Sequence, residues 1–163
     1  MKDEAVQIKQ IQNAIETQDD ALIARLLKEN PRLIDVPNET GWAPLEKAVF
    51  ENQTDIALLL LSEGADVNRR DGQGRTPLHE ATYNSTVEMA ELLMCHGAKL
   101  DTRDYRGATA LHYAAEDGFV DFVELLLQRG ADSSIRDNYG HTPLDGARSR
   151  NRANVVRILE LRE

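Results

Sequence analysis

The sequence predicts an all-α repeat solenoid, because it repeats itself every 33 residues and each copy reads as a turn followed by two short helices. Three residue types recur at this interval in phase: Gly41, Gly74, Gly107 and Gly140; Leu45, Leu78, Leu111 and Leu144; Ala48, Ala81, Ala114 and Ala147. A fixed period of about 20–50 residues indicates one structural unit stacked on copies of itself. We therefore expect a continuous hydrophobic seam between neighbouring units instead of one central core.

The copy at 71–103 shows why the first helix is expected. Residues 71–74 contain two glycines beside an aspartate, a composition typical of a turn. Thr76 can cap a helix with its hydroxyl, and Pro77 suits the first helical position, where a missing N–H does no harm. The first helix is therefore expected to begin at Pro77 and to end near Asn84.

The second helix of this copy is expected to start after Ser85, which together with Glu88 fits a capping box. Its apolar face follows the helical spacing i, i+3, i+4 and consists of Met89, Leu92 and Leu93. A residue in the left-handed conformation is expected to end the second helix of successive copies: Asn30, Gly64, Gly97 and Gly130. Each unit is thus predicted as turn, helix, short loop, helix and turn.

Two segments carry a specific resemblance. GRTPLHEA at 74–81 and GATALHYAA at 107–115 are similar to the T-P-L-H-x-A signature of ankyrin repeats. GWAPLEKA and GHTPLDGA keep the pattern with losses, since Glu46 and Asp145 stand where the histidine is expected. The resemblance implies stacked helix–turn–helix pairs joined by hairpin-like loops. It also implies partner contacts at the turn tips and on the inner face of the first helices.

We interpret the whole chain as one ankyrin-repeat domain that is capped at both ends. The predicted units are an N-terminal cap at 1–37, full repeats at 38–70, 71–103 and 104–136, and a C-terminal cap repeat at 137–163. Arg25 and Glu160 occupy positions that are apolar in the other copies, which favours faces turned to water. A solenoid needs such polar ends to stay soluble, so the array is interpreted as complete.

Composition excludes several classes of protein. No apolar run approaches the length of a membrane helix, and residues 1–10 lack the layout of a secretory signal. The single cysteine excludes an internal disulfide and favours a reducing compartment, so we expect a cytoplasmic monomer. The net charge of −9 disfavours nucleic-acid binding. The one basic cluster lies in the last unit and consists of Arg148, Arg150, Arg152 and Arg157.

No catalytic residue, metal site or cofactor is predicted. His79 and His112 occupy the same repeat position, where the resemblance implies a structural imidazole that binds backbone and ties adjacent turns together. Cys95 and His96 have no second ligand pair at zinc spacing. Two alternatives stay open: an enzyme or a ligand- or metal-dependent regulator that uses His79 and His112, and a weak nucleic-acid contact through the C-terminal arginines.

The leading hypothesis is a non-enzymatic module that binds a protein partner. Aromatic residues and arginines dominate binding hot spots, and most aromatics of this chain fall at positions where the family makes its contacts. The predicted partner-binding residues are Trp42, Phe50, Arg75, Tyr83, Tyr105, Arg106, Tyr113, Tyr139 and His141. Trp42, Tyr105 and Tyr139 lie in turns with little to bury them, whereas Phe50 and Tyr113 could also cover the seam between helices.

The aromatic residues of four consecutive units are expected to project toward one side of the molecule. Acidic residues are expected around their rim: Glu39, Glu51, Glu116 and Asp117. Such a surface suits a partner with an apolar ridge and basic edges.

Overall fold

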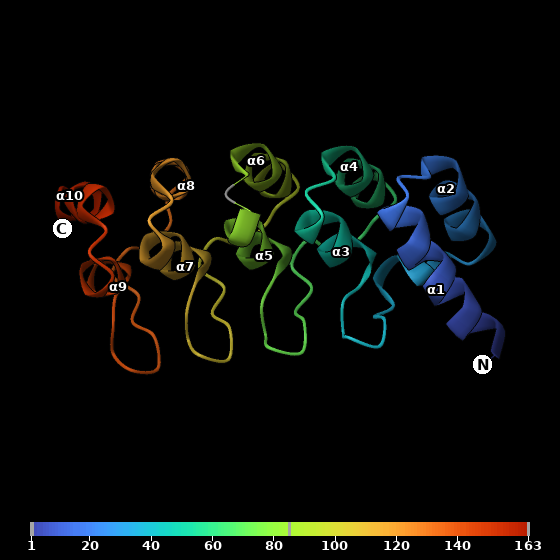
Figure 1. Ribbon diagram of the computed structural model, residues 1–163, viewed down its shortest axis with the longest axis horizontal. Helices are drawn as coiled ribbons and strands as arrows, with labels where there is room; N and C mark the ends of the chain where they lie inside the picture. Colours follow the sequence, from blue (N-terminus) through green and yellow to red (C-terminus); the bar gives the residue numbers. More distant parts are fainter. Residues whose placement is uncertain (1, 85, 163) are drawn as a thin grey trace.

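Pairs of antiparallel helices stand side by side in a single row in the computed structural model, with the two chain ends at opposite ends of the row (Figure 1). The structure describes residues 2–84 and 86–162, and Ser85, the expected cap of a second helix, lies outside them. The described residues contain helices and no strand. The prediction of an all-α repeat solenoid is therefore confirmed.

The inner helices are the first of each pair, and they follow the predicted TPLH segments. They are α3 (Pro44–Phe50), α5 (Pro77–Asn84), α7 (Ala110–Asp117) and α9 (Pro143–Ser149). Proline occupies the first position in three of them, where its fixed φ favours helix and its missing N–H costs nothing. The predicted bounds of α5 are confirmed.

The outer helices are the second of each pair: α4 (Thr54–Ser62), α6 (Val87–Cys95), α8 (Val120–Gln128) and α10 (Ala153–Glu160). Gly64, Gly97 and Gly130 follow the first three with φ between 88° and 95°, as expected. The expectation for Asn30 was wrong, because its φ is −142°. Pro31 follows it, and a residue before proline is forced into extended backbone.

The N-terminal helices α1 (Lys2–Glu16) and α2 (Asp20–Glu29) pack on each other and are followed by the 3-10 turn η1 (Pro31–Asp35). Helix α1 packs on α3, and contacts then run from α3 to α5, α7 and α9 in turn. The buried residues form one apolar cluster along the row, from Ile11 to Leu159. Arg25 and Glu160 are exposed, as their positions predicted.

Four loops project from the inner helices to the same side of the row (Figure 1). We call residues 38–42, 71–75, 104–108 and 137–141 the hairpin loops. In each, the amide of the first residue donates to the carbonyl of the fifth at 2.8–2.9 Å. The hairpin loops and the inner helices together form a surface that we call the inner face.

Candidate protein-binding surface

The first residue of each hairpin loop shapes the loop with its side chain. Asp71 Oδ1 accepts hydrogen bonds from the amides of Gln73 and Arg75 at 2.8 and 2.9 Å. The equivalent oxygens of Asn38, Asp104 and Asp137 accept the same two amides in their own loops. These residues keep the 33-residue spacing, so the sequence held a signal for them that was missed.

A ladder of arginines ties the hairpin loops to one another. The Arg70 guanidinium donates to the carbonyl of Gly74 in its own loop at 3.0 Å and to the carbonyl of Arg103 at 2.8 Å. Arg103 repeats this arrangement with the carbonyls of Gly107 and Arg136. Arg70, Arg103 and Arg136 also recur at the repeat interval, and they too were missed. The second, third and fourth hairpin loops are therefore linked side by side.

The two repeated histidines bind backbone on both sides of the ring. His79 Nδ1 lies 3.0 Å from the amide nitrogen of Thr76. An amide only donates, so Nδ1 accepts and the proton sits on Nε2, which donates to the carbonyl of Ala108 at 3.3 Å. His112 does the same between Thr109 and the carbonyl of His141. Burial lowers the pKa of both rings and keeps them neutral. The predicted structural role is confirmed.

Glu46 and Asp145, which replace the histidine, keep one of its two backbone contacts, the one at the start of the helix. Their carboxylates accept the amides of Ala43 and Thr142 at 2.8 and 2.9 Å, so each helix start is still capped. The buried Glu46 then forms an ion pair at 2.8 Å with the partly exposed Arg69, which also donates to the carbonyl of Gly41. The losses seen in the sequence are thus substitutions that keep the cap.

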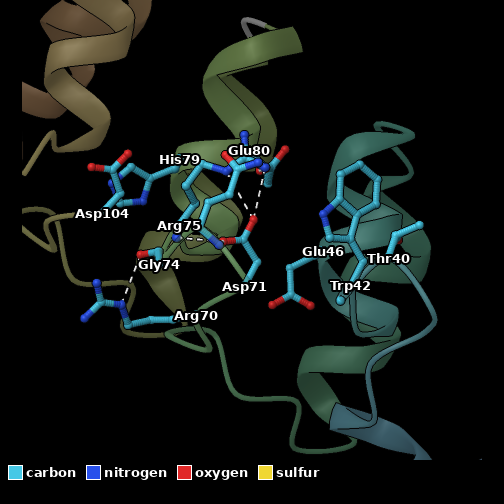
Figure 2. A network of polar contacts seen from close by, with 12 residues as sticks. Thr40, Trp42, Glu46, Arg70, Asp71, Gly74, Arg75, His79, Glu80 and Asp104 are labelled. Carbon is cyan, nitrogen blue, oxygen red and sulfur yellow. Dashed lines mark hydrogen bonds and ion pairs between the residues drawn. The ribbon is translucent and has the colours of Figure 1, made fainter. Parts of the chain in front are cut away.

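Arg75 is the centre of a partly buried charge cluster beside the inner helices (Figure 2). Its Nη2 lies 3.0 Å from Asp71 Oδ2 and 2.8 Å from Glu80 Oε1, and both acids are almost fully buried. Burial raises the pKa of Glu80 to about 7, against the opposing effect of Arg75. The Arg75 Nη1 donates to the hydroxyl of Tyr83 at 3.1 Å, and its guanidinium lies over that ring.

The aromatic residues continue this cluster across neighbouring units. The rings of Tyr83 and Tyr113 are 6.0 Å apart, and Tyr113 donates to Asp104 Oδ2 at 2.6 Å. Arg106 lies over the Tyr113 ring at 5.9 Å. Four of the predicted partner-binding residues therefore meet on the inner face: Arg75, Tyr83, Arg106 and Tyr113.

Trp42 and Phe50 form the corresponding pair one unit earlier. Their rings are 4.7 Å apart, and they are separated by the same eight positions as Arg75 and Tyr83. Trp42 is partly buried, contrary to the expectation that little would cover it, because the Phe50 ring packs against it. Phe50 and Tyr83 remain 42% and 45% exposed. Tyr113 is half-buried, so its ring packs against neighbouring residues and also remains partly at the surface.

The remaining predicted residues lie in the third and fourth hairpin loops, with Tyr105 and Tyr139 near the tips and His141 at the end of its loop. Tyr105 is 67% exposed, although its amide donates to the carbonyl of Gln73 and its ring faces Arg70 at 5.4 Å. Tyr139 is 72% exposed and stacks on His141 at 6.4 Å. The predicted residues therefore form an inner-helix group, of Trp42, Phe50, Arg75, Tyr83, Arg106 and Tyr113, and a loop-tip group, of Tyr105, Tyr139 and His141.

Comparison with known protein families agrees with this geometry. A family profile described as ankyrin repeats (3 copies) matches residues 70–137 and 101–161, and one described as ankyrin repeats (many copies) matches residues 45–94. The chain belongs to the ankyrin-repeat family. Ankyrin repeats are generally protein–protein interaction modules, and their fold is typically non-enzymatic.

The structure also bears on other chemistry that an ankyrin-repeat protein could carry. The described residues contain no group of three or more histidine, cysteine or acidic side chains that could hold a metal ion. None of the helices described is both long and apolar enough to span a membrane.

Three of the four C-terminal arginines of this ankyrin-repeat chain contact its own acids and carbonyls. Arg148 pairs with Glu160 at 2.8 Å, and Arg150 lies 3.7 Å from a carboxylate oxygen of Glu116. Arg152 donates to the backbone carbonyl of Glu116 at 2.9 Å. A nucleic-acid contact through these side chains would compete with these interactions.

Proposed function

We propose that this protein is a non-enzymatic binding module that docks one protein partner on its inner face. The inner-helix group forms the centre of the contact, and the loop-tip group forms its edge. We also propose that the protein acts as a monomer in the cytoplasm, where its single, exposed cysteine would stay reduced.

The observation that carries the proposal is the partly exposed aromatic surface of the inner-helix group. Phe50 and Tyr83 leave nearly half of their surface open, yet each ring is fixed by a neighbour, Trp42 and Arg75 respectively. Preorganised aromatic and arginine side chains lose little entropy on binding, and such residues dominate the energetics of interfaces.

Affinity capture from the source cell tests the proposal when wild-type protein is compared with Trp42→Ala and Tyr83→Ala. A partner retained by wild type should lose at least about 2 kcal/mol of binding free energy with either variant, roughly a thirtyfold weaker Kd. Gln128→Ala, on the exposed side of α8, serves as the control and should leave the Kd unchanged. The proposal fails if the control weakens binding while the aromatic variants leave it intact.

The alternative of a site at His79 and His112 is not favoured by the geometry. Both ring nitrogens of each histidine already contact backbone groups, so a metal or substrate would have to break those hydrogen bonds. Zinc uptake measured with the wild-type protein and with His79→Ala separates the two functions. Stoichiometric uptake that depends on His79 would favour the alternative.

A further inference from the structure

Two basic side chains on the inner face are each clamped between two acids. Lys47 Nζ lies 2.9 Å from Glu16 and 2.8 Å from Glu51. One unit further on, Arg75 lies between Asp71 and Glu80. We call these the Lys47 triad and the Arg75 triad. In each, one cation faces two carboxyl groups, so ionised acids exceed bases by one.

The surrounding charges do not offset this excess. Lys9 pairs with Glu39 at 3.5 Å, and Arg69 pairs with Glu46 at 2.8 Å, so both pairs are balanced. Arg70 points from its hairpin loop toward the third unit, where it binds the carbonyl of Arg103 (Figure 2). The inner face over the first two full units is therefore acidic when both triads are ionised.

The exposed acids belong to the Lys47 triad, and one of them is the neighbour of Phe50 in the sequence. Glu51 directly follows Phe50, and its side chain stays 36% exposed, while that of Glu16 stays 54% exposed. Tyr83 is hydrogen-bonded to Arg75, the centre of the second triad, whose guanidinium already lies over the Tyr83 ring. Aromatic faces attract cations, and neighbouring carboxylates add to that attraction. This combination is complementary to lysine and arginine side chains.

The other end of the inner face has a different charge pattern. Glu116, expected as a rim acid, is close to Arg150 and binds Arg152 through its carbonyl. Arg106 covers Tyr113. Acid is thus not spread evenly around the rim, and its accessible excess lies at the N-terminal half of the inner face.

We propose that the inner face over the first two full units binds a basic segment of the partner, with lysine or arginine side chains placed against Phe50 and beside Glu16 and Glu51. This inference rests on the proposed function, since it names the chemistry of the partner for the same surface. It also gives the bound segment a direction, with its cationic part toward the N-terminal units.

Selection from a displayed library of random 12-residue peptides tests the inference at pH 8, above the pKa of Glu80, in about 50 mM salt. The selected peptides should be enriched in lysine and arginine and depleted in acids. Synthetic copies should bind Glu16→Gln and Glu51→Gln about three- to fivefold more weakly, since one exposed charge pair at close range contributes about 1 kcal/mol. Phe50→Ala should cost tenfold or more.

The matched control is Glu124→Gln, which makes the same change of charge at an exposed position on the outer helix α8. It should leave affinity unchanged, and circular dichroism should show that all variants keep their helix content. Peptides that depend on Phe50 but lack basic residues, or that ignore Glu16 and Glu51, would overturn the inference and leave the proposed function intact. Peptides that ignore Phe50, or no enrichment at all, would overturn both.

Discussion

His79 and His112 each satisfy two backbone groups with one neutral ring, at the start of a helix and in the next hairpin loop. Replacement of His112 by alanine leaves a buried amide of Thr109 without its acceptor at Nδ1. We expect a loss of about 1–2 kcal/mol in the free energy of unfolding, measured by urea denaturation. Partner affinity should be unchanged.

The control for this prediction is His96→Ala. His96 is exposed at the end of α6 and contacts only the helix carbonyl of Leu92 among the bonds described, so its loss should cost well under 1 kcal/mol. Equal losses for the two variants would contradict the role assigned to His112. Loss of partner binding with stability intact would favour a functional site there instead.

Glu80 makes stability depend on pH in a defined direction. Its pKa is about 7 in the folded protein against an ordinary value of 4.5, so the folded state binds the proton more tightly. The stability contributed by this proton is present below pH 4.5 and is lost as the pH rises through 7. Glu80→Gln mimics the protonated form and should remove this loss.

Thermal or urea unfolding of Glu80→Gln and wild type at several pH values between 5 and 8 measures this effect. The free energy of unfolding of the variant should rise relative to that of wild type by about 1–3 kcal/mol between pH 5 and pH 8. The difference should be largest at the alkaline end of that range. Every other titratable residue is the same in both proteins, so the comparison isolates the effect of Glu80. A difference that does not change with pH would show that Arg75 fully compensates the buried charge.

At the scale of the elements, the conformation of each hairpin loop depends on the side chain of its first residue. Asp104 accepts the amides of Arg106 and Ala108 and the hydroxyl of Tyr113. Asp104→Ala leaves these donors unpaired and should cost about 2–4 kcal/mol in the free energy of unfolding, measured by urea denaturation. Asp104→Asn keeps an amide oxygen for the loop, as Asn38 does in the first loop, and should cost less than half as much.

The order of the helices and the bounds of α5 could be predicted from the sequence because they depend on local features, whereas α6 begins after Thr86 and not directly after the expected cap Ser85. Pro77 starts α5 and a glycine ends α4, α6 and α8, whatever lies around them. The prediction of a left-handed conformation for Asn30 was wrong because the proline after it restricts its backbone to the extended region. The unit boundaries at 38, 71, 104 and 137 stay a prediction, since the structure defines helices and not where one repeat begins.

The arrangement of the candidate surface could be predicted only in part. Trp42 and Phe50 are eight positions apart, and only the folded geometry brings their rings to 4.7 Å and buries part of the tryptophan. The cation of the Lys47 triad joins Glu16, the last residue of α1, to Glu51, which directly follows α3 and is distant from Glu16 in the sequence. Repeat spacing locates equivalent positions, but it does not tell which side chains of different units meet.

At the scale of the whole molecule, each unit is stabilised by its neighbours on both sides. Arg70 and Arg103 link neighbouring hairpin loops, and the inner helices pack in sequence along the row. Units at the ends have only one neighbour. In such a row, local opening is easier at the ends than in the middle.

Native-state hydrogen exchange should therefore show a gradient of protection along the row. Amides of α5 and α7, in the middle, should exchange most slowly, and those near the start of α1 should exchange fastest, because residues 4–6 are exposed and α1 lies at one end of the described row. Arg103→Ala removes the hydrogen bond from Arg103 to the carbonyl of Arg136, which links the last unit to the unit before it. The variant should therefore raise exchange in α9 and α10 more than in α3 and α4. Arg129→Ala, which removes an exposed ion pair with Glu91 between outer helices, is the control and should change exchange little. Uniform protection from α1 to α10, or an equal response of both ends to Arg103→Ala, would contradict a row stabilised by nearest neighbours.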